Sequence, residues 1–445
     1  MSFARSPFQR TSALTGLVAL ALTGCGSNPG PAGSGGSSGT GGSGGTGGSG
    51  GSAGSGAPAT CDIALSPGDN DNETVQTAFI EAKPDSTICF NPGTYKFTAE
   101  LLLNGTAGVT VRGIGASRDD VVLDFSGQDE GDEAVDVQAD RFTLEHLTLI
   151  DAPGDGVKVS NSDHPTFRDV KASWRAGSVT TNGAYALYPA LCTNVLIEHC
   201  EVEGASDAGI YLGQSTTGVV RHNRAHGNVI GIEAENSEDV AIYDNESWDN
   251  TCGILVVALP GLTKKITKRT SVHDNLVHDN NRANFGLESA FVSTVPKGSG
   301  ILIASADETH VYGNTLRGNG SPGILVVSWP TIVALGGPAA NDDAFDQYAE
   351  TTYLHDNMFE NNGAAPDAVY TGAPLSLTPP IASIMWDGFT DTAKDASSAP
   401  ARKLCLQNNV GATYLNINVP DLMHPLTDVA AHDCVYAPLT PVAFK

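Results

Sequence analysis

Residues 209–212 read Gly-Ile-Tyr-Leu, and variants of this short pattern recur along the chain. The pattern returns as Gly231-Ile-Glu-Ala, Gly253-Ile-Leu-Val, Gly300-Ile-Leu-Ile and Gly323-Ile-Leu-Val. The leading glycines are 22, 22, 47 and 23 residues apart. A fixed period of this size is typical of stacked repeats, because one short repeat cannot bury an apolar face alone. The recurrence therefore predicts a solenoid.

Each repeat begins with a short strand whose side chains alternate between two faces. Residues one and three positions after the start are expected to point inward, as Ile210 and Leu212 do, and the residues between them to point to solvent. Two further short strands complete each coil. Because parallel crossovers are nearly always right-handed, we predict an all-β, right-handed parallel β-helix with coils of about 22 residues. The alignment places the strand starts near Ala134, Gly156, Tyr185, Gly209, Gly231, Gly253, Gly300 and Gly323.

Pairs of asparagines five residues apart form a second recurring signal. Asparagine tolerates the left-handed backbone of sharp corners, and its amide can hydrogen-bond to the next coil. We interpret these residues as stacking ladders rather than catalytic groups. The pairs are Asn223/Asn228, Asn245/Asn250, Asn275/Asn280, Asn314/Asn319 and Asn357/Asn362.

The N-terminal part of the chain has the composition of an export signal followed by a tether. Residues 1–24 combine Arg5 and Arg10 with an apolar run, which predicts a signal peptide. Leu22-Thr-Gly-Cys25 resembles a bacterial lipobox, which implies cleavage before Cys25 and acylation of its thiol. By the same resemblance, Gly26 implies delivery to the outer membrane. Residues 25–59 are rich in Gly and Ser and predict a disordered tether.

The rest of the chain is divided into three regions according to the regularity of the repeat. Residues 60–133 are expected to form an N-terminal cap and the first coils, and residues 134–335 the central β-helix. Residues 336–445 lose the clear period and predict last irregular coils with a C-terminal cap.

The balance of charge restricts the partners of the protein. The chain has 445 residues and a formal net charge of -26. A protein this acidic repels polyanions, so nucleic acid is excluded as an expected partner. After the N-terminus, no apolar run reaches the length of a transmembrane helix.

Seven cysteines follow Cys25, and an exported protein is expected to form disulfides. Cys61–Cys89 and Cys405–Cys434 are the expected pairs, one near each end of the folded part. Cys192, Cys200 and Cys252 leave an odd thiol whose pairing the sequence does not decide.

Two insertions interrupt the regular spacing and point to a binding face. One falls at 173–183, and the larger one follows Asn280 in the same corner of the coil. Both should overhang one edge of the sheet formed by the glycine-led strands. Projecting loops on a rigid scaffold often carry binding.

Polar side chains gather on the outer face of the coils between the insertions, whereas later coils carry Leu255, Leu302 and Leu325 at the same positions. We expect this patch to be the site. The catalytic candidates are Lys158, Tyr185, Asp207, Tyr211 and Glu233. The candidates for substrate binding are Asp155, Tyr188, Gln214, Glu235, Asn236 and Trp174.

The patch is compatible with several chemistries. Asp207, Glu233 and Glu235 could bind Ca²⁺, which prefers oxygen ligands. Alternatively, Tyr211 or Tyr185 with Lys158 could move the proton next to a uronate carboxylate, a step shared by lyases and C5-epimerases. A pair of carboxylates could instead hydrolyse a glycosidic bond. The last alternative is a solvated face of an acidic protein.

From Leu101 to Pro330 the chain resembles exported bacterial parallel β-helix repeat proteins. The residues that carry this likeness include Asp151-Ala-Pro-Gly-Asp-Gly-Val-Lys, Asn182-Gly-Ala-Tyr-Ala-Leu-Tyr-Pro, Ala205-Ser-Asp-Ala-Gly-Ile-Tyr-Leu-Gly-Gln-Ser, Gly231-Ile-Glu-Ala-Glu-Asn-Ser and Gly253-Ile-Leu-Val-Val-Ala-Leu-Pro-Gly-Leu. The resemblance implies a secreted or lipid-anchored β-helix, often encoded beside a c-type cytochrome, with no established activity.

The wider superfamily is similar to pectate lyases and mannuronan C5-epimerases. The chain lacks the Asp-Pro-His-Asp motif of the alginate epimerases, and Asp163-His-Pro does not match it. Their catalytic residues are therefore not transferred to this chain.

The sequence thus predicts an outer-membrane-anchored β-helix that binds a polysaccharide. The expected modification of that polysaccharide is the chemistry of a uronate lyase or C5-epimerase. The alternative function is a non-catalytic module that binds a partner protein such as a c-type cytochrome.

Overall fold

The computed structural model describes residues 60–391, 404–421 and 423–444, and these residues form a right-handed parallel β-helix. Every strand pairing between its coils is parallel, as the repeat predicted. The signal peptide, Cys25 and the tether predicted for residues 1–59 lie outside the described residues. Within the described part, no helix is both long and apolar enough to span a membrane.

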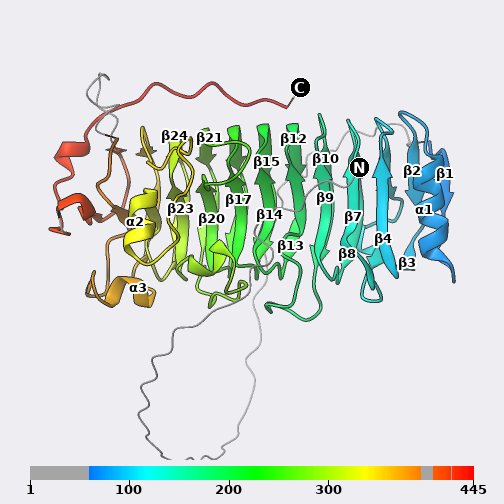
Figure 1. The fold of residues 1–445 in the computed structure, drawn as a ribbon, viewed down its shortest axis with the longest axis horizontal. Helices are drawn as coiled ribbons and strands as arrows, with labels where there is room; N and C mark the ends of the chain where they lie inside the picture. The colour runs from blue at the N-terminus through cyan, green and yellow to red at the C-terminus, as the bar shows by residue number, and fades with distance from the viewer. Residues whose placement is uncertain (1–59, 392–403, 422, 445) are drawn as a thin grey trace, which may run out of the picture. The chain divides into compact units, whose positions relative to one another are not determined.

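The glycine-led strands form one sheet of eleven strands, called sheet B here, and several of them are seen side by side in Figure 1. Its members are β4 (Ala99–Asn104), β7 (Glu130–Gln138), β9 (Asp155–Ser160), β11 (Leu187–Ala190), β14 (Ala208–Gly213), β17 (Ile230–Glu235), β20 (Cys252–Val257), β23 (Ser299–Ala304), β26 (Ile324–Val327), β29 (Ile384–Trp386) and β31 (Tyr414–Asn416).

The other two strands of each coil belong to a connected set of twenty strands, called sheet A here. Its members are β1 (Ile63–Leu65), β2 (Thr87–Phe90), β3 (Gly93–Lys96), β5 (Thr110–Gly113), β6 (Val121–Asp124), β8 (Thr143–Ile150), β10 (Thr166–Ser173), β12 (Thr193–Glu198), β13 (Glu201–Glu203), β15 (Thr216–Arg221), β16 (Arg224–His226), β18 (Glu238–Tyr243), β19 (Glu246–Trp248), β21 (Thr267–His273), β22 (Leu276–His278), β24 (Ala306–Tyr312), β25 (Thr315–Arg317), β27 (Tyr353–His355), β28 (Met358–Glu360) and β30 (Cys405–Gln407).

The register of sheet B puts equivalent apolar residues on top of one another inside the coil. Ile210 pairs with Ile232, and Ile232 pairs with Ile254. These side chains are fully buried in one continuous core. The inward positions predicted from the repeat are therefore confirmed. The coil before them differs from the alignment, because its strand β11 starts at Leu187 and not near Tyr185.

The asparagine pairs form the predicted ladders. The Asn275 amide donates to Asn314 Oδ1 at 3.0 Å, and its own Oδ1 accepts from the amide of Asn245 at 3.0 Å. One expectation about these corners is wrong. The left-handed φ belongs to the residue before the asparagine, for example 53° at Asp244 and 53° at Asp274. The asparagine therefore contributes hydrogen bonds from its side chain and its backbone N–H rather than the left-handed turn.

Both predicted disulfides are present, Cys61–Cys89 and Cys405–Cys434. Cys192, Cys200 and Cys252 are buried free thiols. Helix α1 (Asp71–Glu81) lies at the N-terminal end of the coils in Figure 1, where its Val75 and Phe79 are buried. Helices α2 (Trp329–Ala334) and α3 (Ala368–Thr371) lie toward the other end.

The outer face of sheet B is not uniformly exposed to solvent, which corrects a further expectation. Tyr211, Leu255 and Leu302 point away from the core of the coil, as the alternation predicted. However, they are buried in a second apolar cluster formed with other parts of the chain. That cluster includes Val292 and Val295 of the larger insertion and Tyr370 of α3. The insertions and the C-terminal segments therefore cover part of the sheet.

Candidate functional site

The outward side chains of sheet B form rows, because parallel strands in register place equivalent residues side by side. One row contains Asp136, Lys158 and Tyr188 on β7, β9 and β11. It continues with Tyr211 and Glu233, which are paired on β14 and β17. Polar and phenolic groups thus follow one another on consecutive strands. The row becomes apolar at Leu255, the partner of Glu233 on β20.

Three tyrosines form a cluster at the centre of this row. The ring centroid of Tyr185 lies 4.7 Å from that of Tyr188 and 4.4 Å from that of Tyr211. The Tyr188 and Tyr211 rings meet edge to face at 5.0 Å. Tyr185 precedes its strand, and its backbone N–H donates to Asp155 Oδ1 at 3.0 Å. The sequence thus brings together the three phenols predicted to belong to the site.

Asp207, Glu233 and Glu235 gather beside the tyrosines. The Tyr211 hydroxyl donates to Glu235 Oε1 at 2.5 Å, and the Tyr185 hydroxyl donates to Asp207 Oδ2 at 3.3 Å. Burial raises the pKa of Glu235 to about 7. Burial, and then the charge of Glu235, raise the pKa of Asp207 to about 8. These carboxyl groups therefore exchange protons near neutral pH.

Glu233 interacts electrostatically with both of the other carboxyl groups, Asp207 and Glu235. Its burial, together with Asp207 and Glu235, raises its pKa well above the ordinary value. The same causes, burial first and a neighbouring carboxylate second, raise the pKa values of Tyr185 and Tyr211 well above 10. A site with this environment holds a neutral acid and a proton acceptor next to each other at neutral pH.

Lys158 is the cation of the row, and its charge is already paired. Its Nζ donates to Glu133 Oε1 and lies 5.6 Å from the centroid of the Tyr188 ring. Burial alone would lower the pKa of Lys158, but the hydrogen bond to Glu133 outweighs it and raises this pKa. Burial raises the pKa of Asp155, on the same strand, to about 7.

Three carboxyl groups near Lys158 were missed by the sequence analysis. They are Glu100, Glu133 and Asp136, on β4 and β7. Burial, followed by a hydrogen bond with Glu133, raises the pKa of Glu100 to about 8. Asp136 stands two residues after the strand start at Ala134, just as Tyr211 stands two residues after Gly209. The repeat therefore already predicted an outward side chain at Asp136. Glu100 follows an irregular register between β4 and β7, which hides its place from the pattern.

Gly213 allows the phenol of Tyr211 to reach Glu235. A Cβ at position 213 would lie 2.1 Å from Tyr211 Cε1 and 2.5 Å from its hydroxyl oxygen. The ring therefore lies directly over this glycine, in the space that any other side chain would fill. Gly213 also pairs with Glu235 in the sheet, so it sets the distance between the phenol and its acceptor.

Gln214 and Asn236, two of the expected substrate-binding residues, hold a loop instead. The Gln214 side chain accepts from the N–H of Thr263 at 2.9 Å. The Asn236 amide donates to Leu259 O at 3.0 Å and to Lys264 O, while its oxygen accepts from Leu259 N–H at 2.7 Å. The Asn236 amide group and the Gln214 oxygen are thus engaged by the chain itself.

Trp174 is also placed differently from the expectation. It was predicted to offer its ring to a sugar from the first insertion. It is 6 % exposed, belongs to the core cluster, and its indole N–H donates to Ala152 O at 2.6 Å. The ring therefore anchors the insertion to the coil.

The expected calcium ligands gain no support from the geometry. In the described parts of the chain, no three His, Cys, Asp or Glu side chains form a group that could hold a metal ion. Two of the three expected ligands accept hydrogen bonds from phenols instead: Asp207 from Tyr185 and Glu235 from Tyr211.

The two insertions do lie at one edge, as predicted. Ser178 of the first and Arg282 and Phe285 of the second line a single hollow of about 430 Å³. Arg282 is paired there with Asp249 at 2.5 Å.

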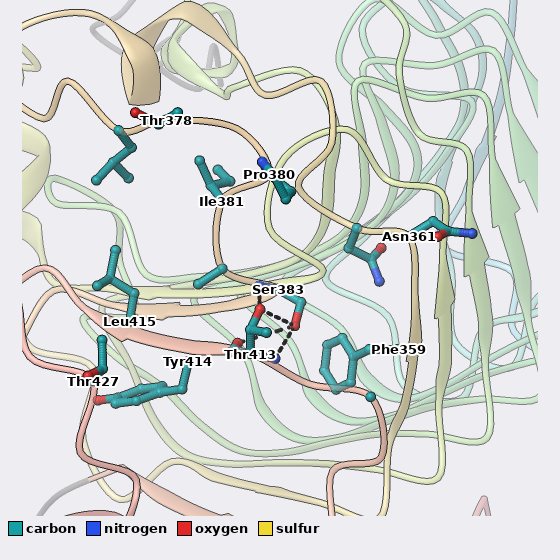
Figure 2. Close-up of a pocket in the computed structure, with 14 residues that line it drawn as sticks. Phe359, Asn361, Thr378, Pro380, Ile381, Ser383, Thr413, Tyr414, Leu415 and Thr427 are labelled. Carbon is teal, nitrogen blue, oxygen red and sulfur yellow. Dashed lines mark hydrogen bonds between the residues drawn. The ribbon is translucent and has the colours of Figure 1, made fainter.

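A separate pocket of about 440 Å³ lies among the last coils (Figure 2). Its lining is uncharged, with apolar side chains such as Ile381 and Leu415. The hydroxyls of Ser383 and Thr413 lie 3.4 Å apart, and each is engaged with the backbone of the other residue. The Tyr414 phenol in its lining is hydrogen-bonded to His432 Nε2 at 2.8 Å, and none of the described residues that line the pocket carries a carboxyl group. We therefore place the candidate site on the tyrosine and carboxyl cluster of sheet B.

Comparison with known proteins agrees with the fold described above. Residues 133–336 match a family model described as right handed beta helix region. The A-module of the mannuronan C-5 epimerase AlgE6 from Azotobacter vinelandii is 14% identical, with 78% of this chain and 92% of that chain covered and a TM-score of 0.48. An alginate lyase from Paenibacillus sp. is also 14% identical, with 67% of this chain and 94% of that chain covered and a TM-score of 0.45. No curated protein matches the sequence.

Proposed function

We propose that this protein binds a polysaccharide on the outer face of sheet B and modifies it by acid–base chemistry. The observation that carries the proposal is the hydrogen bond from Tyr211 to Glu235 beside Asp207 and Glu233, two carboxyl groups with raised pKa values. General acid–base catalysis works best when the catalytic pKa lies near the working pH. The partly exposed rings of Tyr185 and Tyr188 beside these groups offer flat surfaces to a sugar.

The reaction that we propose is proton removal at C5 of a uronate unit, as in a lyase or a C5-epimerase. Because the pKa of Tyr211 is raised well above 10, its proton is not lost in a separate step. The two transfers are concerted: Glu235 takes the phenol proton as the phenol oxygen takes the proton from C5. In a lyase, the electrons of the broken C–H bond form the C4–C5 double bond, and O4 leaves with a proton from a neutral carboxyl group. In an epimerase, a proton returns to C5 from the opposite face.

The neutral carboxyl groups have a second role in this proposal. Lys158 is already paired with Glu133, so it supplies little free positive charge to a uronate carboxylate. Asp207 and Glu233 in their protonated forms can donate hydrogen bonds to that carboxylate instead. An acidic protein can thereby accept an acidic sugar.

The test is to incubate the protein with alginate, pectate and neutral polysaccharides and to follow unsaturated products by absorbance and C5 exchange by proton NMR in D₂O. We expect turnover of a uronate polymer, and Tyr211→Phe and Glu235→Gln to lose most of it. Tyr243→Phe and Glu81→Gln are matched controls on other surfaces and should retain it. Inertness of the protein toward the whole panel would contradict the proposal.

We further propose that the protein is an exported lipoprotein of the outer membrane, with Cys25 as its acylated residue. The lipobox-like residues before Cys25 support this. Labelled palmitate should enter the expressed full chain and should be absent from the Cys25→Ala variant. Equal labelling of both would contradict the anchor without affecting the proposed reaction.

A further inference from the structure

We propose that the binding face of sheet B is closed from Tyr211 onward, so that it accepts the end of a polysaccharide and the protein acts from chain ends. This inference rests on the proposed function and adds a mode of action to it. It is carried by the change in exposure along one row of side chains and by the segments that cause that change.

The groups of the site follow the stacking direction of the coils rather than a single strand. Asp136, Lys158, Tyr188, Tyr211 and Glu233 lie on five successive strands of sheet B. Adjacent strands are about 4.8 Å apart, so the row extends over roughly 19 Å. A polymer that contacts all five side chains must therefore lie along the row.

Exposure is higher at the N-terminal end of this row than at its other end. Leu102, which pairs with Asp136 at the N-terminal end, is 42% exposed, and the Lys158 side chain is 29% exposed. Tyr211 and Glu233 are 5% and 4% exposed, and Leu255 is 1% exposed. The row is thus open from the first coils as far as Tyr188 and closed from Tyr211 onward.

The closure is made by the protein's own segments. Val292 and Val295 of the larger insertion pack in the same cluster as Tyr211, Leu255 and Leu302. An ideal Cβ at Gly286 of this insertion would lie 3.4 Å from Ser206 O, so the insertion reaches the coil of Asp207.

Tyr370 of α3 and Ile381 extend the cover toward the last coils, where Leu325 and Met385 are buried beneath them. These contacts remove apolar surface from water and stabilise the closed arrangement. A polymer lying along the row therefore stops at Tyr211, whose hydroxyl donates to Glu235 of the carboxyl cluster. Its terminal unit is thereby placed next to the acid–base groups.

The test compares binding to alginate and to pectate, each as the intact polymer and as a partial hydrolysate of equal mass. We expect the amount of protein bound per mass of polymer to rise in proportion to the number of chain ends. Turnover should release one small product while the viscosity of the intact polymer falls slowly. Binding that depends on polymer mass alone, or a rapid loss of viscosity, would overturn the inference and leave the proposed function standing. If the protein binds neither alginate nor pectate, whether intact or hydrolysed, this inference is overturned. If it also neither binds nor turns over the neutral polysaccharides, the proposed function is overturned as well.

A variant with residues 285–295 replaced by a short Gly-Ser linker tests the cause of the closure. We expect it to bind intact polymer more strongly than the parent does and to lose the preference for fragments. The Val429→Ala variant, at an exposed position outside the site, is the control. An unchanged preference in a folded linker variant would contradict the role given to the insertion. If the linker variant does not fold, the comparison of intact and hydrolysed polymer with the parent protein decides the question.

Discussion

The position of the Tyr211 phenol depends on the residue two places after it. We expect Gly213→Ala to push the ring away from Glu235, because the added Cβ would lie 2.1 Å from the ring. Overpacking of this kind costs about 1–3 kcal/mol, and turnover should fall more than stability does. Gly68→Ala is the control, since nothing lies within 4 Å of a Cβ at that position. Wild-type turnover in a folded Gly213→Ala protein would contradict the role of the Tyr211–Glu235 pair.

The carboxyl cluster makes stability depend on pH with a defined sign. A carboxyl group whose pKa is raised on folding binds more protons in the native state, so its contribution to stability is lost as pH rises through the folded pKa. For Asp207 the loss extends from the ordinary pKa near 4 up to the folded pKa of about 8. For Glu235 it extends up to a folded pKa of about 7.

We therefore expect Glu233→Gln to become more stable relative to the parent as pH rises from 5 to 9, by about 1 kcal/mol or more. The amide cannot ionise, so it avoids the cost of placing a charge beside Asp207 and Glu235. Denaturant unfolding at several pH values measures this, with exposed Glu81→Gln as the control. A stability difference that does not change with pH would show that Glu233 is not held neutral.

The individual residues of the site were partly predictable. Tyr211, Glu233 and Glu235 follow from the alternation in the repeat, because the outward position is set by the strand alone. The roles of Gln214 and Asn236 were not predictable, since they depend on a loop that returns from 259–264. The burial of the row was missed for a similar reason. It is caused by segments more than fifty residues away in the sequence, such as Val292 and Tyr370.

At the scale of elements, the asparagine ladders hold successive coils together at one corner. The Asn275 side chain donates to Ile242 O at 2.9 Å and accepts from the backbone N–H of Asn245 at 3.0 Å. Both backbone groups are buried, and a buried polar group without a partner costs about 1–3 kcal/mol. The ladder thus replaces backbone hydrogen bonds where the chain turns.

We expect Asn275→Ala to lower the free energy of unfolding by about 2–4 kcal/mol, because it leaves at least two buried backbone groups without partners. Asn341→Ala, in an exposed loop, should change it by less than about 0.5 kcal/mol. Equilibrium unfolding in denaturant compares the two. Similar small effects in both variants would mean that the ladder is not a source of stability.

The regular elements were easier to predict than the covering ones. The glycine-led strands and the ladders repeat with the coil, so each copy supports the others. The insertion at 281–299 and helices α2 and α3 occur once, and their packing on sheet B depends on tertiary contacts that no repeat encodes. The two disulfides were predictable because each pair lies near one end of the folded part.

For the whole molecule, the net charge of -26 should govern encounters with charged polymers. Like charges repel over roughly one Debye length, which is about 8 Å at physiological ionic strength. We expect the association rate with alginate to rise as salt is added, because screening weakens this repulsion. The association rate with a neutral polysaccharide that the protein binds should stay nearly constant. A rate with alginate that falls with salt would indicate an attractive basic surface and contradict this account.

The central claim is that a polysaccharide lies along the row on sheet B that begins at Asp136, with its end at Tyr211. The most direct measurement is a crystal structure of the Glu235→Gln variant soaked with uronate oligosaccharides. The account predicts sugar rings against Lys158 and Tyr188, with the terminal unit at Tyr211. Oligosaccharide bound only in the uncharged pocket near Ser383 and Thr413, or on sheet A, would contradict it.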